Sequence, residues 1–139
     1  MFQSRSGKQR KIEQILEKYA SSNKVIAALV SNEEGLPIAS QVENKTSEYL
    51  LSAMAATLLT TANAAAFRLE MGPTDLIRVE LKTGTLLIRE IRERACLMLV
   101  VKNDANLPYF DITIRKMINE IDRVLFPDLF PPEQSFKEE

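Results

Sequence analysis

The sequence predicts a single α/β domain in which a five-stranded, mixed but mostly antiparallel sheet lies between helices. The chain has 139 residues, a length typical of one domain. Apolar residues make up 45% and charged residues 27% of the chain, as in globular proteins that bury a core. Segments with helical periodicity alternate with apolar runs of strand length in the order α-β-β-α-β-β-β-α.

The domain is expected to cover residues 7–126, after a flexible N-terminus at 1–6. Its first helix is predicted at 7–22, because apolar residues recur at helical spacing, namely at Ile12, Ile15, Leu16 and Tyr19. The run KVIAALVS at 24–31 follows as a strand. Both of its faces are apolar, so we expect it to be central and covered on both sides.

The stretch SNEEGLPIAS predicts a hairpin, in which NEEG joins the first strand to a second short run at 36–40. Pro37 lacks an N–H, which favours the edge of the sheet for this second strand. Glu33 and Glu34 then point from the tip into water. Since no charged neighbour is available to tune them, a solvated tip is favoured over a catalytic pair of carboxylates.

The long segment 46–70 predicts a helix with two apolar sides. The side packed on the sheet is expected to contain Leu51, Ala55, Leu58, Ala62, Ala65 and Leu69. The opposite side is uncharged and mostly small, and contains Ala53, Ala56, Thr57, Thr60, Ala64 and Phe67. A surface helix normally exposes charges, whereas small residues allow another backbone to approach. A second copy of the chain is the favoured cover, because two-fold dimers are the commonest soluble assembly; the alternative is a helix enclosed within a monomer.

We expect no membrane insertion, because the longest uncharged run, Tyr49 to Phe67, contains several polar residues. The N-terminus has no apolar segment typical of a signal peptide. The single cysteine, Cys96, lies in an apolar run and is expected to be a core residue. These features favour a reducing, cytoplasmic compartment.

Residues 75–102 predict three antiparallel strands, at about 75–81, 85–91 and 95–102. One face of the first of these is partly charged, which is typical of an edge, whereas the last is apolar on both faces. The strand order 2-1-5-4-3 places the apolar strands in the centre. The helix at 46–70 then crosses from one edge of the sheet to the other.

The last helix is predicted at 107–125, with Asn106 as its N-cap and Pro108 in its first turn. Its buried stripe is expected to contain Phe110, Ile114, Met117, Ile121 and Leu125. A tail at 127–139 follows, with three prolines and several large apolar residues. These residues either fold back on the domain or bind a partner.

Several classes of function are excluded by residues that the sequence lacks. There is no histidine, so a Ser-His-Asp triad or a histidine-based zinc site cannot form within one chain. None of the four glycines stands in a phosphate-binding loop motif. The net charge of −1 gives no general attraction for nucleic acid. We therefore predict no catalytic residue, no metal and no cofactor.

The order of elements, together with ALVSNEEGLPIAS in the first hairpin, resembles the roadblock / dynein light chain domain family over residues 8–125. This resemblance implies homodimers or heterodimers that align the long helices and join the third strands, which adds Ile77 and Val79 to the expected interface. It also implies Ras-like small GTPases as partners, and acceleration of GTP hydrolysis in bacterial members. No catalytic residue is shared across the family, so none is carried over.

Three hypotheses of function follow. The first is a dimeric regulator or scaffold of a Ras-like small GTPase, paired with itself or a paralogue. The arginines available to such a regulator as a finger are Arg68, Arg89, Arg92 and Arg94, unless they are ordinary solvated side chains. The second is a passive adaptor in a larger complex. The third is an enzyme or small-molecule sensor, which would need a pocket with converging polar groups.

Overall fold

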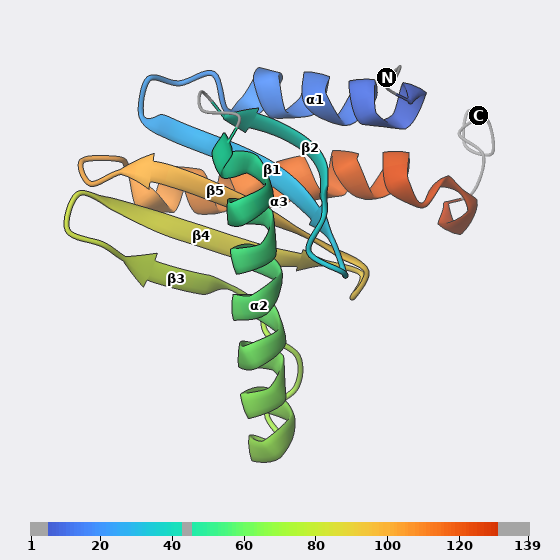
Figure 1. The fold of residues 1–139 in the computed structure, drawn as a ribbon, viewed down its shortest axis with the longest axis vertical. Coiled ribbons are helices and arrows are strands. Elements are labelled where there is room, and N and C mark those ends of the chain that lie inside the picture. Colours follow the sequence, from blue (N-terminus) through green and yellow to red (C-terminus); the bar gives the residue numbers. More distant parts are fainter. Residues whose placement is uncertain (1–5, 43–45, 131–139) are drawn as a thin grey trace, which may run out of the picture.

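The computed structural model describes residues 6–42 and 46–130. Residues 1–5, which belong to the predicted flexible N-terminus, and 131–139, which form most of the predicted tail, lie outside the described residues. The elements are α1 (Gly7–Tyr19), β1 (Val25–Asn32), β2 (Pro37–Val42), α2 (Thr46–Leu69), β3 (Ile77–Glu80), β4 (Gly84–Ile91), β5 (Ala95–Lys102), α3 (Leu107–Leu125) and the 3-10 turn η1 (Pro127–Leu129) (Figure 1). Every predicted helix and strand is present. The first helix ends earlier than predicted, because two serines and an asparagine follow and favour turns over helix.

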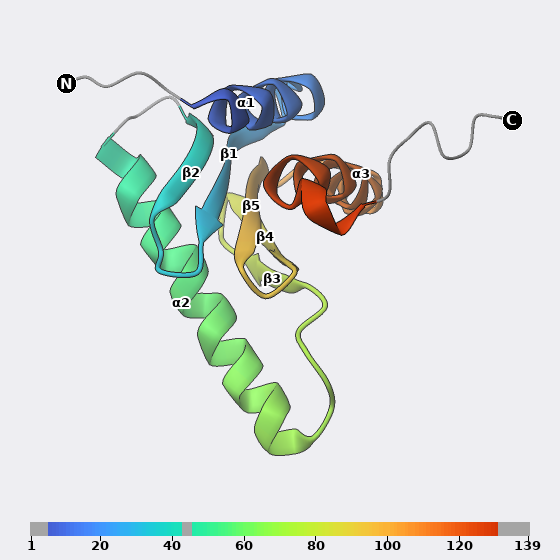
Figure 2. The same cartoon turned by 90° about the vertical axis from the view of Figure 1, so that its right-hand side faces the viewer.

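The strand order β2-β1-β5-β4-β3 confirms the predicted topology. All four strand pairs are antiparallel, so the described sheet contains no parallel pair. Helices α1 and α3 cover one face of the sheet and α2 lies on the other (Figure 2). The strands β2 and β3 form the two edges, as predicted.

The core is divided by the sheet into two unequal parts. Sixteen buried residues form the cluster on the side of α1 and α3, including Ile12, Leu16, Leu97, Leu99, Phe110 and Met117. Six form the cluster on the side of α2, namely Leu29, Ala55, Leu59, Ile88, Cys96 and Met98. Burial raises the pKa of the Cys96 thiol to about 11, as expected for a core cysteine. Because the core cluster on its side of the sheet is the smaller one, α2 has less of its surface covered than α1 or α3.

The caps of α1 and α3 follow from the residues that precede each helix. The Ser6 hydroxyl accepts a hydrogen bond from the Gln9 N–H at 3.0 Å. The side-chain oxygen of Asn106 accepts one from the Tyr109 N–H at 3.1 Å, which confirms the predicted cap. The predicted stripe of α3 is buried from Phe110 to Ile121, and Leu125 is half-buried.

The hairpin at NEEG is also confirmed. The Asn32 side-chain oxygen accepts hydrogen bonds from the N–H groups of Glu34 and Leu36, at 2.9 and 3.0 Å. Gly35 has a φ of 88°, which glycine adopts without strain. Glu33 and Glu34 are exposed at the tip, as expected for a solvated turn.

The prediction that both faces of the first strand are covered is wrong at one residue. The register between β1 and β5 shifts between Val25 and Ala27, so a bulge interrupts the alternation of side chains. Ile26 lies in this bulge and is 47% exposed. Beyond it, the strand is buried from Ala27 to Ser31.

The large apolar residues of the predicted tail are partly accounted for by the domain. Phe126 packs against the core on the side of α1 and α3. Phe130 lies beneath the guanidinium groups of Arg92 and Arg123, at 5.4 and 4.5 Å from its ring centre. Leu129 is exposed, and Phe136 lies outside the described residues. The beginning of the tail therefore folds back on the domain.

Gly84 provides a test of the close approach between β4 and β5. A Cβ added there would lie 2.7 Å from the carbonyl oxygen of Val101, which is fixed in the sheet. Gly84→Ala is expected to lower the free energy of unfolding by about 1–3 kcal/mol, measured by urea denaturation. Gly7→Ala is the control, because a Cβ at Gly7 meets nothing within 4 Å. Equal stability of the two variants would contradict the close approach at Gly84.

Candidate protein–protein interface

Helix α2 crosses the sheet from the side of β2 and extends past the edge formed by β3 (Figures 1 and 2). The dimensions of helix and sheet explain this overhang. The helix has 24 residues, which makes it about 36 Å long at 1.5 Å per residue. Five strands spaced ~4.8 Å apart span only about 19 Å between the outer strands. The sheet is therefore too narrow to cover the whole helix.

The burial of the inner stripe of α2 declines along the helix. Ser52 and Ala55 are fully buried and Leu59 is 9% exposed. Ala66, further along the same side, is half-buried, and Leu69 is 66% exposed. These residues are spaced three, four or seven apart and so lie on one side of the helix. The inner stripe thus continues as apolar residues beyond the sheet that covers its first half.

The predicted sheet-facing side is correct only for the first part of the helix. Ala55 is buried, and Leu51, Leu58 and Ala62 are half-buried. Ala65 and Leu69 are exposed, contrary to the prediction, and belong to the last turns of the helix, whose end extends past β3 (Figure 1). The buried Ser52 belongs to the inner side instead, where its hydroxyl donates a hydrogen bond to that of Ser31 in β1 at 2.8 Å.

The opposite side of α2 is exposed at five of the six predicted interface positions, namely Ala53, Thr57, Thr60, Ala64 and Phe67, and half-buried at Ala56. Phe67 is 83% exposed. Further exposed apolar side chains, none of which the sequence predicted to be exposed, lie on the helix or directly after it, at Tyr49, Leu50, Met54, Leu69 and Met71. Exposed apolar surface of this extent is typical of a site that binds another molecule.

The small residues at two of these positions have an explanation within the fold. The hairpin tip packs on α2 so closely that a Cβ on Gly35 would lie 3.4 Å from the Cα of Ala53 and 3.6 Å from the Cβ of Ala56. Small side chains at these two positions thus leave room for the hairpin tip to contact the helix. This explanation does not extend to Ala64 and Phe67, which lie in the overhanging half of the helix.

The length and composition of Glu48–Leu69 would also suit a membrane span. Only 17% of the most apolar 18-residue window in this stretch is buried, whereas a core helix would be mostly buried. Ser52, Ala55 and Leu59 nevertheless bind the helix to the sheet. The helix is thus part of the domain and has an apolar outer side that the described residues leave uncovered.

The edge strand β3 lies beside this helix. It pairs with β4 on one side, and in the sheet of described residues no strand lies on its other side. Ile77 and Val79 are half-buried, and Ile77 packs against the core cluster beneath α2. Arg78 and Glu80 form an exposed ion pair at 2.7 Å. The free N–H and C=O groups of such an edge can pair with another strand.

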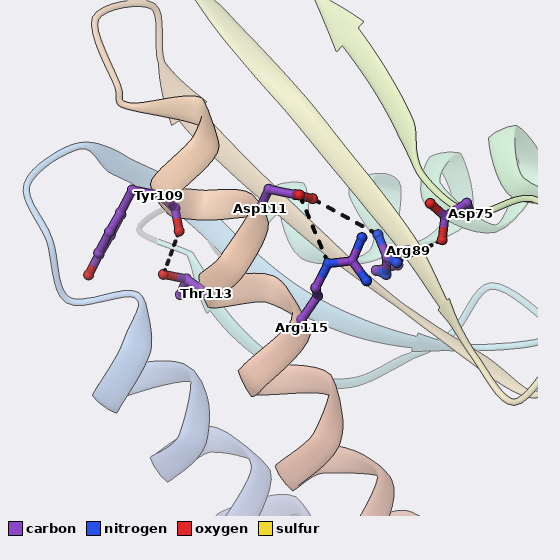
Figure 3. A network of polar contacts seen from close by, with 6 residues as sticks. All are labelled: Asp75, Arg89, Tyr109, Asp111, Thr113 and Arg115. Atoms are coloured by element: carbon purple, nitrogen blue, oxygen red, sulfur yellow. Dashed lines mark hydrogen bonds and ion pairs between the residues drawn. The ribbon is translucent and has the colours of Figure 1, made fainter.

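Three of the four arginines considered as fingers are bound within the domain. Arg89 forms an ion pair with Asp75 at 2.7 Å and its side chain is only 12% exposed (Figure 3). Arg92 forms one with Asp122 at 2.7 Å, and Arg94 lies over the ring of Phe126. Arg89 is therefore largely enclosed in the domain, whereas Arg92 and Arg94 remain exposed beside their partners, as ordinary solvated arginines are. Arg68 is exposed, and in the described part of the chain it makes no ion pair.

The described residues contain no group of three or more His, Cys, Asp or Glu side chains that could hold a metal ion. An open groove of about 690 Å³ runs along the overhanging half of α2, beside the connection to β3 and the turn between β4 and β5. Three carboxylates line it, those of Glu70, Glu90 and Glu93. The Asn63 amide donates a hydrogen bond to Glu90 at 3.3 Å. Apart from these carboxylates and the Asn63 amide, the described lining of the groove carries no polar side chain.

Residues 11–102, well over half of the chain, match the family model of the Roadblock/LC7 domain. A Roadblock/LC7 domain structure from Streptomyces avermitilis has a TM-score of 0.78 at 16% identity, covering 82% of this chain and 97% of that one. Myxococcus xanthus MglB has a TM-score of 0.81 at 14% identity, covering 95% and 99%. The gliding protein MglB of Thermus thermophilus has a TM-score of 0.76 at 17% identity, covering 86% and 91%. At these identities the likeness shows a shared fold. The comparison with curated proteins finds no significant match.

Neighbouring positions on α2 test the division into inner and outer sides. Leu59→Arg is expected to unfold the domain, because it would place an unpaired charge in the core. Thr60→Arg is expected to keep the folded circular dichroism spectrum, because this residue is exposed. A Thr60→Arg variant that loses its helical signal as Leu59→Arg does would contradict this assignment of sides.

Proposed function

We propose that this chain, which belongs to the Roadblock/LC7 domain family, is a dimeric regulator or scaffold of a Ras-like small GTPase. The observation that supports this most is the uncharged, exposed outer side of α2 beside the free edge of β3. The family resemblance supplies the class of partner. The proposed interface contains Ala53, Ala56, Thr57, Thr60, Ala64, Phe67, Ile77 and Val79.

A two-fold pairing of β3 edges would cover the exposed side of α2 and the free edge of β3 together. Two antiparallel edges would join the sheets, and the overhanging half of each α2 would then lie over the partner's sheet. The inner stripe that is exposed at Leu69 would be covered by that sheet. The outer residues Ala64 and Phe67 would approach the second copy of α2. A paralogue with the same edge and helix would fit equally well.

The apolar overhang is large enough to contribute to stable pairing. Full burial of a phenylalanine or leucine side chain stabilises by about 1.5–3 kcal/mol. Phe67 and Leu69 are 83% and 66% exposed, so each has surface left to bury. A protein interface typically buries about 800 Å² on each partner. The outer side of α2 and the edge of β3 would together supply this contact.

Regulation of a GTPase would work through binding one conformation of its switch loops better than another. A finger supplied in trans can accelerate hydrolysis by ~10³–10⁵. Arg68 is the candidate for that role, because Arg89, Arg92 and Arg94 have partners within the domain. The alternative, a passive adaptor, is favoured by the same three contacts, which leave fewer arginines for catalysis. We place this function in the cytoplasm, where a buried free thiol such as Cys96 stays reduced.

The proposed pairing predicts the solution mass. The wild type is expected to be a dimer, and Ala64→Arg is expected to be a folded monomer, because the substitution places two guanidinium groups near the two-fold axis. Light scattering after size exclusion measures both masses. Ile112→Arg is the control, since Ile112 is 57% exposed but lies on α3, across the sheet. A monomeric wild type, or a dimer that survives Ala64→Arg, would refute the pairing through α2.

Single-turnover GTP hydrolysis separates regulator from adaptor. A purified Ras-like GTPase from the same genome is loaded with GTP and mixed with the wild type, with Arg68→Ala or with buffer. A regulator that uses a finger is expected to accelerate hydrolysis at least about tenfold, and Arg68→Ala to abolish the gain. An adaptor is expected to bind the GDP-loaded and GTP-loaded forms equally and to leave the rate unchanged. Absence of binding to either form would rule out both roles toward that GTPase.

A further inference from the structure

The edge strand β3 is weakly held by the apolar core. It has four residues, and none of its side chains is fully buried. Its backbone pairs with β4 from Ile77 to Glu80. A strand of this kind opens easily unless other contacts hold it, because few apolar contacts must be broken.

Polar contacts fix the segment that leads into β3, residues 70–76. The side-chain oxygen of Asn63 in α2 accepts a hydrogen bond from the Thr74 N–H at 2.9 Å. The next residue, Asp75, accepts one from the Arg89 guanidinium at 2.7 Å (Figure 3). The start of β3 is therefore held by two consecutive residues, from α2 on one side and from β4 on the other.

Arg89 connects this contact to the opposite layer of the domain. It lies in β4 between Leu87 and Ile91, whose side chains belong to the core on the side of α1 and α3. Its Nη1 lies 4.0 Å from Oδ1 of Asp111 in α3, and Arg115 approaches Oδ2 of Asp111 at 3.9 Å (Figure 3). Asp75, Arg89, Asp111 and Arg115 thus form a line of alternating charges from the edge of the sheet to α3.

The facing atoms of Arg89 and Asp111 in this line are shielded from water, although the Asp111 side chain as a whole is 40% exposed. Nη1 of Arg89 and Oδ1 of Asp111 are buried atoms without a hydrogen-bond partner among the described residues. Their opposite charges therefore interact through a medium of lower dielectric constant than water, which strengthens the attraction. Arg89 thus has Asp111 at 4.0 Å on one side, and on the other side its Nη2 donates a hydrogen bond to Asp75.

We propose that Arg89 is a positioning residue that clamps Asp75 to the body of the domain and so holds β3 in place for pairing with a second copy. The pairing part rests on the proposed function. The clamp itself concerns one chain and stands without it. An ordinary surface ion pair contributes little, but here one partner is 12% exposed and joins the edge of the sheet to a different layer.

The chain offers a matched control within β3 itself. The ion pair between Arg78 and Glu80 has the same length of 2.7 Å, but its side chains are 50% and 64% exposed and belong to one strand. Glu80→Ala removes a carboxylate from a pair that connects no separate elements. Asp75→Ala removes a carboxylate that is 78% exposed, so the folded core should tolerate the change.

Hydrogen exchange of the full chain, at a concentration low enough to keep it monomeric, tests the clamp. The amides of β3 that bond to β4 are expected to exchange about tenfold faster in Asp75→Ala than in the wild type. Glu80→Ala is expected to stay within about twofold of the wild type. Unchanged β3 exchange in Asp75→Ala, or an equal increase in both variants, would overturn the clamp.

Sedimentation equilibrium of the same variants tests whether the clamp at Asp75 supports pairing of two copies. Asp75→Ala is expected to raise the dimer dissociation constant about tenfold, and Glu80→Ala to change it less than about twofold. Faster β3 exchange with an unchanged dissociation constant would overturn the link. A wild type that stays monomeric would overturn the proposed function and the link, while the exchange rates would still decide the clamp.

Discussion

The mismatch between a long helix and a narrow sheet is the constraint on which the rest of the structure depends. Helix α2 packs across five strands, but only its first half finds a sheet beneath it. The residues that continue its inner stripe, such as Leu69, are therefore exposed although they are apolar. The free edge of β3 lies where the helix leaves the sheet. Both unsatisfied features occur at one place, so one partner can satisfy both.

The two layers of the domain differ in how much of the core each contributes. The larger core cluster beneath α1 and α3 holds the sheet, and the smaller one fixes α2 through Ala55 and Leu59. The hairpin tip at Gly35 and the polar contacts of Asn63 and Arg89 position the elements that the core holds least. These contacts fix the backbone beneath the exposed surface of α2. An interface that binds without large rearrangement requires such a fixed backbone.

Much of the fold could be predicted from the sequence, because it depends on local signals. The turn at NEEG, the cap at Asn106 and the apolar faces of β5 each follow from a few adjacent residues. The exposure of Ile26 could not be predicted from the sequence, since a bulge depends on the register with the neighbouring strand. The internal partners of Arg89 also required the fold, because Asp75 and Asp111 are distant in sequence. The overhang of α2 could have been predicted from the sequence, because the predicted helix length and the number of strands together imply it.

The central claim is that the outer side of α2 is covered by a second copy, and hydroxyl-radical footprinting tests it most directly. Oxidation of Met54 and Phe67 is followed as the protein concentration rises from nanomolar to micromolar. Tyr109, 55% exposed on α3, is the internal reference. We predict that Met54 and Phe67 become protected with rising concentration while Tyr109 does not change. Oxidation of all three residues at constant rates throughout this range would contradict it.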